Sequence, residues 1–202
     1  MRFLAVLTRL LHSCGMRQLC CLWLIGLAGC TATPSSASLL ADAEPNQAVR
    51  LLIAGDRLLS TAVPIDFHAV PALARTTSEA IAPDGVLEFC AHEIGPRGEG
   101  FRLEKRYEEP FPHVRSVLVD MLGNVLERSH TVPVAKVPQD VLGAALSSGT
   151  FVDSVAIVSG PVQEEFWHVV TKDRRGRIFV ITVDLDGNVL SQLRRNQSRV
   201  DS

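Results

Sequence analysis

An acidic turn near the end of the chain has the spacing with which a calcium loop begins. Asp184, Asp186 and Asn188 surround Gly187, and calcium loops place their first oxygen ligands at alternate positions. The bidentate glutamate that closes such a loop is missing, because Arg195 stands at its position. We therefore expect a solvated hairpin turn, with no metal and no cofactor.

The other residues that could do chemistry are scattered. Structural zinc sites cluster their ligands, whereas the histidines beyond the N-terminal segment show no paired spacing: His68, His92, His113, His130 and His168. Cys90 lies in an apolar alternating run, where a free cysteine is normally a small buried side chain. Neither a Gly-x-Ser-x-Gly nucleophile turn nor a Gly-rich phosphate loop is present. The sequence therefore favours a protein that is not an enzyme.

A basic turn and an aromatic strand are the remaining candidates for binding. The turn at 174–177, together with Arg194 and Arg195, would bring several guanidinium groups to one end of a sheet, although charged turns also serve simply to protect strand edges. Aromatic and arginine side chains are enriched at protein interfaces. The candidate binding residues are Trp167, His168, Arg174, Arg175 and Arg177.

The first thirty residues have the composition of an export signal. Three arginines and no acidic residue accompany the apolar run 19–27. Leu27-Ala28-Gly29-Cys30 follows and resembles the lipobox of bacterial lipoproteins, whose cysteine accepts diacylglycerol. The apolar run is about half the roughly 20 residues that a membrane-spanning helix needs. We expect residues 1–29 to be a lipoprotein signal peptide and Cys30 to carry the lipid, palmitate included, although Met16 is an alternative start.

The resemblance to lipoproteins also implies an address. Thr31 follows the cysteine, where many lipoproteins of the inner membrane carry aspartate. This favours a lipid anchor on the periplasmic face of the outer membrane. Residues 30–46 are rich in Ser, Ala, Thr and Pro and are expected to form a flexible tether. Without residues 1–29 the chain has 17 basic and 22 acidic residues, a net charge of −5, which does not suit a nucleic-acid partner.

The rest of the chain contains an internal repeat. Val119-Asp120-Met121-Leu122-Gly123-Asn124-Val125-Leu126 recurs as Val183-Asp184-Leu185-Asp186-Gly187-Asn188-Val189-Leu190. Val-Pro and Gly-Pro pairs recur in the same order, and self-similarity at a fixed period indicates duplication. We expect two repeats, 67–132 and 133–202. Residues 47–66 form either an N-terminal hairpin or a partial third repeat.

Each repeat is predicted to be one helix followed by four antiparallel strands. Proline suits the first helical turn, and an apolar face follows both Pro71 and Pro138. Each unit is too small to bury a core alone. We therefore expect an α+β fold in which both repeats share one antiparallel sheet, with the helices on one face and the other face open.

These motifs are similar to a known family. Val-Pro opening a short helix, with strands ending in Val-Asp-x-x-Gly-x-Val-Leu, resembles the PepSY-like repeats of bacterial secreted and lipidated proteins, over residues 63–193. The wider group includes the tandem-repeat β-lactamase inhibitory proteins. The resemblance implies a periplasmic or surface module that binds or inhibits other proteins through an exposed sheet.

The leading hypothesis is therefore a membrane-anchored envelope lipoprotein. It would bind an envelope protein or peptide, without catalysis, through the open sheet face. The alternative is a structural envelope lipoprotein that self-associates or scaffolds other envelope components.

Overall fold

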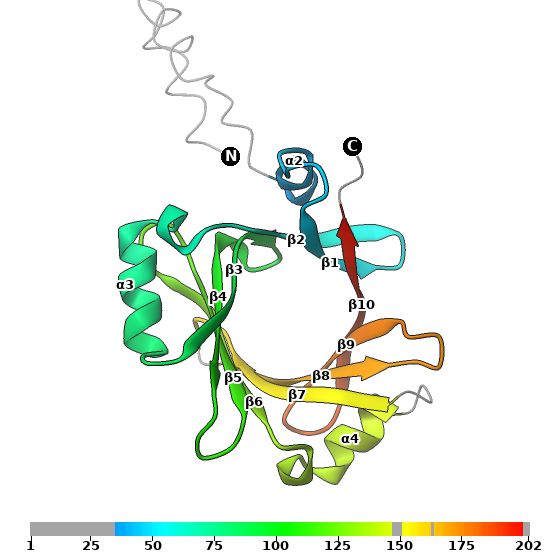
Figure 1. The fold of residues 1–202 in the computed structure, drawn as a ribbon. Helices are drawn as coiled ribbons and strands as arrows, with labels where there is room; N and C mark the ends of the chain where they lie inside the picture. Colours follow the sequence, from blue (N-terminus) through cyan, green and yellow to red (C-terminus); the bar gives the residue numbers. More distant parts are fainter. Residues whose placement is uncertain (1–34, 147–150, 163, 200–202) are drawn as a thin grey trace, which may run out of the picture. The chain divides into compact units, whose positions relative to one another are not determined.

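Ten antiparallel strands form a closed barrel in the computed structural model, which describes residues 35–146, 151–162 and 164–199 (Figure 1). In chain order the strands are β1 (Ala48–Ala54), β2 (Arg57–Pro64), β3 (Val86–Gly95), β4 (Gly98–Tyr107), β5 (His113–Val119), β6 (Val125–Val132), β7 (Phe151–Ser159), β8 (Glu165–Lys172), β9 (Ile178–Val183) and β10 (Val189–Arg199). Each strand pairs with the strands before and after it, and β1 pairs with β10.

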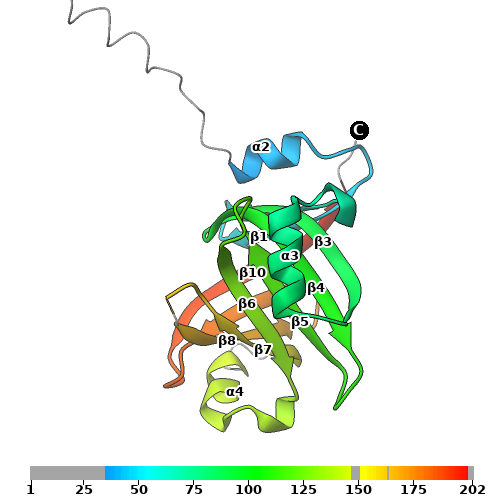
Figure 2. The ribbon, with the colours of Figure 1, turned by 90° about the vertical axis from the view of Figure 1, so that its left-hand side faces the viewer.

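Three short helices of the described residues lie outside the barrel. They are α2 (Ser36–Ala41), α3 (Ala72–Ile81) and α4 (Gln139–Leu146), and the 3-10 turns η2 (Phe67–Ala69) and η3 (Val134–Lys136) precede the last two. Helix α2 contacts β2 and β3, α3 contacts β5, and α4 contacts β8 and β9. Figure 2 shows α3 along the outer surface of the strands around β5. None of these helices is long and apolar enough to cross a membrane.

The hydrophobic core lies between the helices and the outer surface of the barrel. Side chains of a strand point alternately to its two faces, and here the apolar set faces outward. Under α3 the cluster is Val70, Ala74, Ala82, Cys90, Phe101, Leu103, Val117 and Val119. Under α4 it is Val137, Val141, Ala145, Val155, Trp167, Val169, Ile181 and Val183. A smaller cluster under α2 consists of Leu39, Val49, Val63 and Ile94.

The predicted α+β fold, in which two helix-plus-four-strand repeats share an open sheet, is wrong. The order of one helix and then four strands does occur twice, with α3 before β3–β6 and α4 before β7–β10. However, the hairpin of β1 and β2 pairs with both edges of these eight strands: Leu52 lies opposite Arg195, and Thr61 opposite Ile94. Unpaired strand edges expose backbone donors and acceptors, and closing a barrel removes them. The sheet face opposite the helices lines the inside of the barrel and is not an open surface.

The flexible tether expected over 30–46 does not describe residues 36–41, which form helix α2. Ser35 caps α2 with a capping box, and Leu39 of this helix is only 8% exposed. The Thr61 hydroxyl of β2 donates a 2.8 Å hydrogen bond to the Ser36 carbonyl. Residues 36–41 are therefore part of the folded unit. The signal peptide predicted over 1–29, and Cys30, lie outside the described residues.

The repeated turn motif is explained by an aspartate that closes the turn. The Asp184 carboxylate accepts hydrogen bonds from the backbone N–H groups of Asp186 and Asn188 and from the Asn188 side chain. The bonds from Asn188, above all, lower the pKa of Asp184. Gly187 supplies a φ of +87°, which side chains with a Cβ rarely adopt. The carboxylate that suggested a calcium ligand is thus used by the turn itself.

Replacing Gly187 by alanine should destabilise the barrel more than the same change at Gly176. Both glycines have positive φ, which costs an L-residue about 1–2 kcal/mol. A Cβ at Gly187 would also approach Asp140 Cβ of α4 to 3.2 Å, whereas a Cβ at Gly176 would meet nothing within 4 Å. Urea unfolding measures both losses. Equal losses would show that the turn does not pack against α4.

Candidate binding site in the barrel lumen

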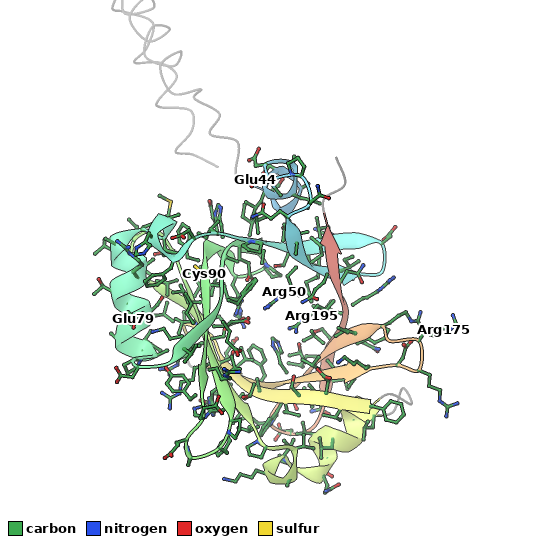
Figure 3. The ribbon with its side chains drawn as sticks, in the orientation of Figure 1. Glu44, Arg50, Glu79, Cys90, Arg175 and Arg195 are labelled. Carbon is green, nitrogen blue, oxygen red and sulfur yellow. The ribbon has the colours of Figure 1, made fainter. Side chains whose placement is uncertain are left out.

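The barrel lumen encloses a cavity of about 690 Å³. All ten strands contribute to its wall: Arg50, Ser60, Glu93, Arg102, Ser116, Glu127, Ala156, His168, Thr182 and Arg195 are one residue from each, in chain order. In Figure 3, Arg50 and Arg195 point into this space from β1 and β10. An eight-stranded barrel is just wide enough for side chains to fill, and diameter grows with strand number. Ten strands therefore leave room that the side chains do not occupy.

One end of the barrel forms the mouth of this cavity. Because every strand is antiparallel to its neighbours, the hairpin turns after β1, β3, β5, β7 and β9 lie at the same end. Pro96, Arg97 and Glu164 from these turns, and Leu190 just after the last of them, line the cavity. Leu190 is 60% exposed. We call this end the mouth, and β10 runs inward from it through Leu193 to Arg195.

The half of the lumen formed by β1–β6 is charged, and Arg102 is at its centre. The Arg102 guanidinium pairs with the Glu93 carboxylate through Nε and Nη2. Nη2 also lies 3.1 Å from Glu127 Oε1, and Nη1 donates to Ser116 Oγ at 3.0 Å. The side chain of Arg102 on β4 therefore binds groups of β3, β5 and β6.

The electrostatics of this cluster fix its protonation states. Burial disfavours the ionised form of Glu93, but the charge and hydrogen bonds of Arg102 outweigh burial and lower the pKa of Glu93. Burial likewise opposes the charge on Arg102, and the carboxylates of Glu93 and Glu127 outweigh it and raise the pKa of Arg102. Breaking such a buried cluster by removing one partner is strongly unfavourable.

A second ion pair completes the charged half. Arg50 Nη1 lies 2.6 Å from Glu104 Oε1, and its guanidinium lies 3.8 Å from the centre of the Phe89 ring. At the mouth, Arg97 Nε lies 3.8 Å from the second oxygen of Glu127. Each inward-facing glutamate of β1–β6 therefore has an arginine partner.

The half of the lumen formed by β7–β10 is mostly uncharged. Leu193, Val180 and Val170 are cross-strand neighbours and form one apolar strip. Beside it Ser191 donates a 2.9 Å hydrogen bond to Thr182, which lies opposite His168. The lumen is therefore amphipathic, with paired charges on one side and apolar and hydroxyl side chains on the other.

His168 faces the lumen as a neutral side chain. Burial lowers its pKa to about 4, and the nearby Glu127 only partly opposes this shift. Its ring lies 5.2 Å from the ring of Phe166. Within the described part of the chain, no side chain or backbone group forms a hydrogen bond with the imidazole.

Arg195 differs from the other inward-facing charges. No described residue pairs with its guanidinium or accepts a hydrogen bond from it, although it is partly buried. Burial, and then the charges of Arg50 and Arg102, lower the pKa of Arg195, while Glu104 and Glu93 oppose the shift. An arginine nevertheless stays charged at any physiological pH.

The structure separates the binding residues predicted from the sequence. Of the candidates, His168 faces the lumen, whereas Trp167 packs under α4 and is 8% exposed. The turn carrying Arg174, Arg175 and Arg177 lies outside the barrel, and Figure 3 shows Arg175 directed away from it. Arg177 pairs with Asp173 at 2.6 Å. The basic turn and His168 therefore do not form one site.

The charged cluster of the lumen was missed by the sequence analysis. The sequence pattern that could have indicated this cluster lies in β4, where Arg102 and Glu104 alternate with Phe101 and Leu103. Such alternation indicates a half-buried strand with one polar face. In an open sheet that polar face meets solvent, so the pairing of Arg102 with Glu93 and Glu127 could be found only from the closed ring.

The comparisons with known proteins assign no family to this chain. No family model matches the sequence, and no curated protein matches it significantly. A candidate periplasmic protein of Bacteroides eggerthii overlaps with a TM-score of 0.48 at 14% identity, covering 62% of this chain and 88% of that one. A DUF2874 family protein of Bacteroides uniformis reaches 0.46 at 14%, covering 63% and 88%.

A BLIP-like protein of Bacteroides fragilis overlaps with a TM-score of 0.38 at 15% identity, covering 65% of this chain and 88% of that one. The structural neighbours thus include the wider group that the sequence motifs resemble. At these scores the likeness assigns this chain neither to that group nor to a function. Membership of the PepSY-like repeats stays a prediction.

Acidification should destabilise the barrel through His168, and His168→Gln should remove that effect. The pKa of His168 falls from 6.5 to about 4 on folding, so between these values the unfolded chain binds a proton that the folded chain does not. The contribution of neutral His168 to the free energy of unfolding should be complete above pH 6.5. It should decrease as the pH falls towards 4, by on the order of a few kcal/mol.

Urea unfolding at several pH values measures this dependence. His68→Gln is the matched control, because His68 is exposed and lies outside the lumen. A His168→Gln protein that loses stability with acid as steeply as the wild type would show that His168 is not a neutral group of the lumen.

Proposed function

We propose that this chain is a lipid-anchored envelope protein that binds a small molecule inside its barrel, without catalysis. The observation that supports this most is the position of the core. The apolar clusters lie outside the barrel under the helices, and the lumen keeps a cavity of about 690 Å³. Protein interiors normally have few voids larger than a water molecule.

The size and the wall of the cavity fit a ligand site. Small-molecule sites are typically about 300–1,000 Å³, with mostly apolar walls and a few placed polar groups. The strip of Leu193, Val180 and Val170 supplies an apolar wall. Thr182, Ser191 and Arg195 supply polar groups beside it. A protein or peptide partner on the predicted open sheet face has no support, because the face opposite the helices lines the lumen of the closed barrel.

The state of the titratable groups supports binding rather than catalysis. The glutamates on the strands of the lumen, Glu93, Glu104 and Glu127, are paired with arginines, and a general acid or base needs a pKa near the working pH. The pKa of Glu93 is lowered and that of His168 is about 4. Among the described residues, no three His, Cys, Asp or Glu side chains are grouped as metal ligands.

Filling the lumen should abolish ligand binding. Ala156 lines the cavity on β7, and Ala156→Trp would occupy the space with an indole ring. The probe is 1-aminoanthracene, an uncharged fluorophore whose emission rises in apolar cavities. We expect the full-length wild type to bind it and Ala156→Trp to lose binding at least about tenfold, the effect of roughly 1.4 kcal/mol.

Ala135→Trp is the control, because Ala135 is exposed on η3, outside the barrel. It should bind the probe as the wild type does. If the wild type shows no binding, or if Ala156→Trp binds equally well while folded by circular dichroism, the lumen is not a ligand site.

The lipid anchor is supported by the lipobox at 27–30. Cys30→Ala should abolish incorporation of labelled palmitate into the protein, and globomycin should cause the unprocessed precursor to accumulate. Cys90→Ala is the control and should keep the label, because Cys90 is buried in the barrel wall and burial raises its pKa to about 11. Palmitate retained in the Cys30→Ala protein would contradict lipidation at this residue.

A further inference from the structure

The charges of the lumen are unevenly satisfied. Arg102 engages two carboxylates, Glu93 and Glu127, and Arg50 engages Glu104. Arg195 is the inward-facing charge of the described strands that has no carboxylate within ion-pairing distance. A charge removed from water without a partner is costly. Its guanidinium borders the cavity, so its N–H donors face space that a ligand could occupy.

The surroundings of Arg195 leave it no protein partner. Its cross-strand neighbours are Leu52 of β1 and Ile178 of β9, whose side chains have no atom that can accept a hydrogen bond. Burial, and then the positive charges of Arg50 and Arg102, lower the pKa of Arg195, while Glu104 and Glu93, which are already paired with Arg50 and Arg102, only partly oppose this shift. This corner of the lumen therefore favours an added negative charge.

An apolar strip adjoins this corner. Leu193 stands two residues before Arg195 on β10 and so shares its face of the strand, and Val180 and Val170 continue the strip across β9 and β8. Leu193 lies nearer the mouth than Arg195. A molecule entering from the mouth would meet apolar side chains first and the guanidinium more deeply.

We propose that the lumen selects an organic carboxylate with an apolar body, and that Arg195 binds its carboxylate while the Leu193 strip contacts its body. Arginine offers a planar fork of donors that matches a carboxylate bidentately. An inorganic anion would leave the apolar strip without a contact in a cavity of about 690 Å³. This inference rests on the proposed function, because it names the ligand class of the same lumen.

A matched set of probes tests the ligand class in the wild type alone. 1-Naphthaleneacetate, naphthalene-1-acetamide and 2-(naphthalen-1-yl)ethylamine share one ring system and carry a negative, a neutral and a positive group. Calorimetry on the full-length protein in a non-ionic detergent should give the tightest binding for the acid. The amide should bind at least about tenfold more weakly, because a charge-assisted pair contributes roughly 1.5–3 kcal/mol. The amine should bind most weakly.

Two arginine variants assign the effect to one side chain. Arg195→Met should lower the affinity for the acid to the affinity for the amide. The affinity for the amide should not change. Arg194→Met is the matched control, since Arg194 directly precedes Arg195 on the same strand and is exposed on the opposite face. It should retain the full preference for the acid. Arg195→Lys keeps the charge without the fork and should lie between the two.

The outcomes separate this inference from the proposed function. Equal binding of acid and amide by the wild type would overturn the inference, while leaving a lumen that binds ligands. A preference for the acid that survives in folded Arg195→Met would overturn the role of Arg195. Absence of binding by all three probes, together with absence of 1-aminoanthracene binding, would overturn both proposals. The wild-type comparison stands even if a variant fails to fold.

Discussion

The pairing of Arg102 with Glu93 and Glu127 is the constraint on which the rest of the structure depends. It places a buried guanidinium of β4 between carboxylates of β3 and β6. A fully buried charge is costly unless it is paired and hydrogen-bonded, so these strands must curve until the groups meet. The inner face of the wall is thereby committed to polar contacts. The apolar side chains of the same strands have to be covered from outside.

The helices and the first hairpin follow from that commitment. Helices α3 and α4 each cover one apolar patch of the outer surface, using buried positions four residues apart, Ala74 and Ser78 in one and Val141 and Ala145 in the other. The hairpin of β1 and β2 supplies the last two strands, and α2 covers it through Leu39. Hydrophobic stabilisation is thus placed around the barrel, and the lumen is left for polar groups and a ligand.

Local features of this fold could be predicted from the sequence, and long-range ones could not. The helices after Pro71 and Pro138 and the turn that ends at Asn188 follow from nearby residues, because capping and turn geometry are local. Ring closure depends on the pairing of β1 with β10, from opposite ends of the described chain, and no local pattern encodes that pairing.

The candidate site shows the same division. The alternation in β8 separates Trp167 from His168, as strand geometry requires, but it cannot say which face is covered by a helix. Polar residues such as Arg102 and Glu127 look alike in a sequence whether they face solvent or a lumen. The unpaired state of Arg195 is a property of the whole ring, because it depends on which arginine each glutamate contacts.

The most direct measurement of the central claim is the accessibility of a cysteine placed in the lumen. Ser154 lines the cavity, whereas its neighbour Val155 points to the core under α4 and is 1% exposed. Native Cys90 is buried, with its pKa raised to about 11, and serves as an internal reference for protection. A small anionic methanethiosulfonate should rapidly modify the thiol of the Ser154→Cys variant in the native protein. The extent of modification is measured from the masses of its peptides. Val155→Cys and Cys90 should stay unmodified until the protein is unfolded. Protection of Ser154→Cys equal to that of Val155→Cys would show that the lumen is a closed core and would contradict a ligand site inside the barrel.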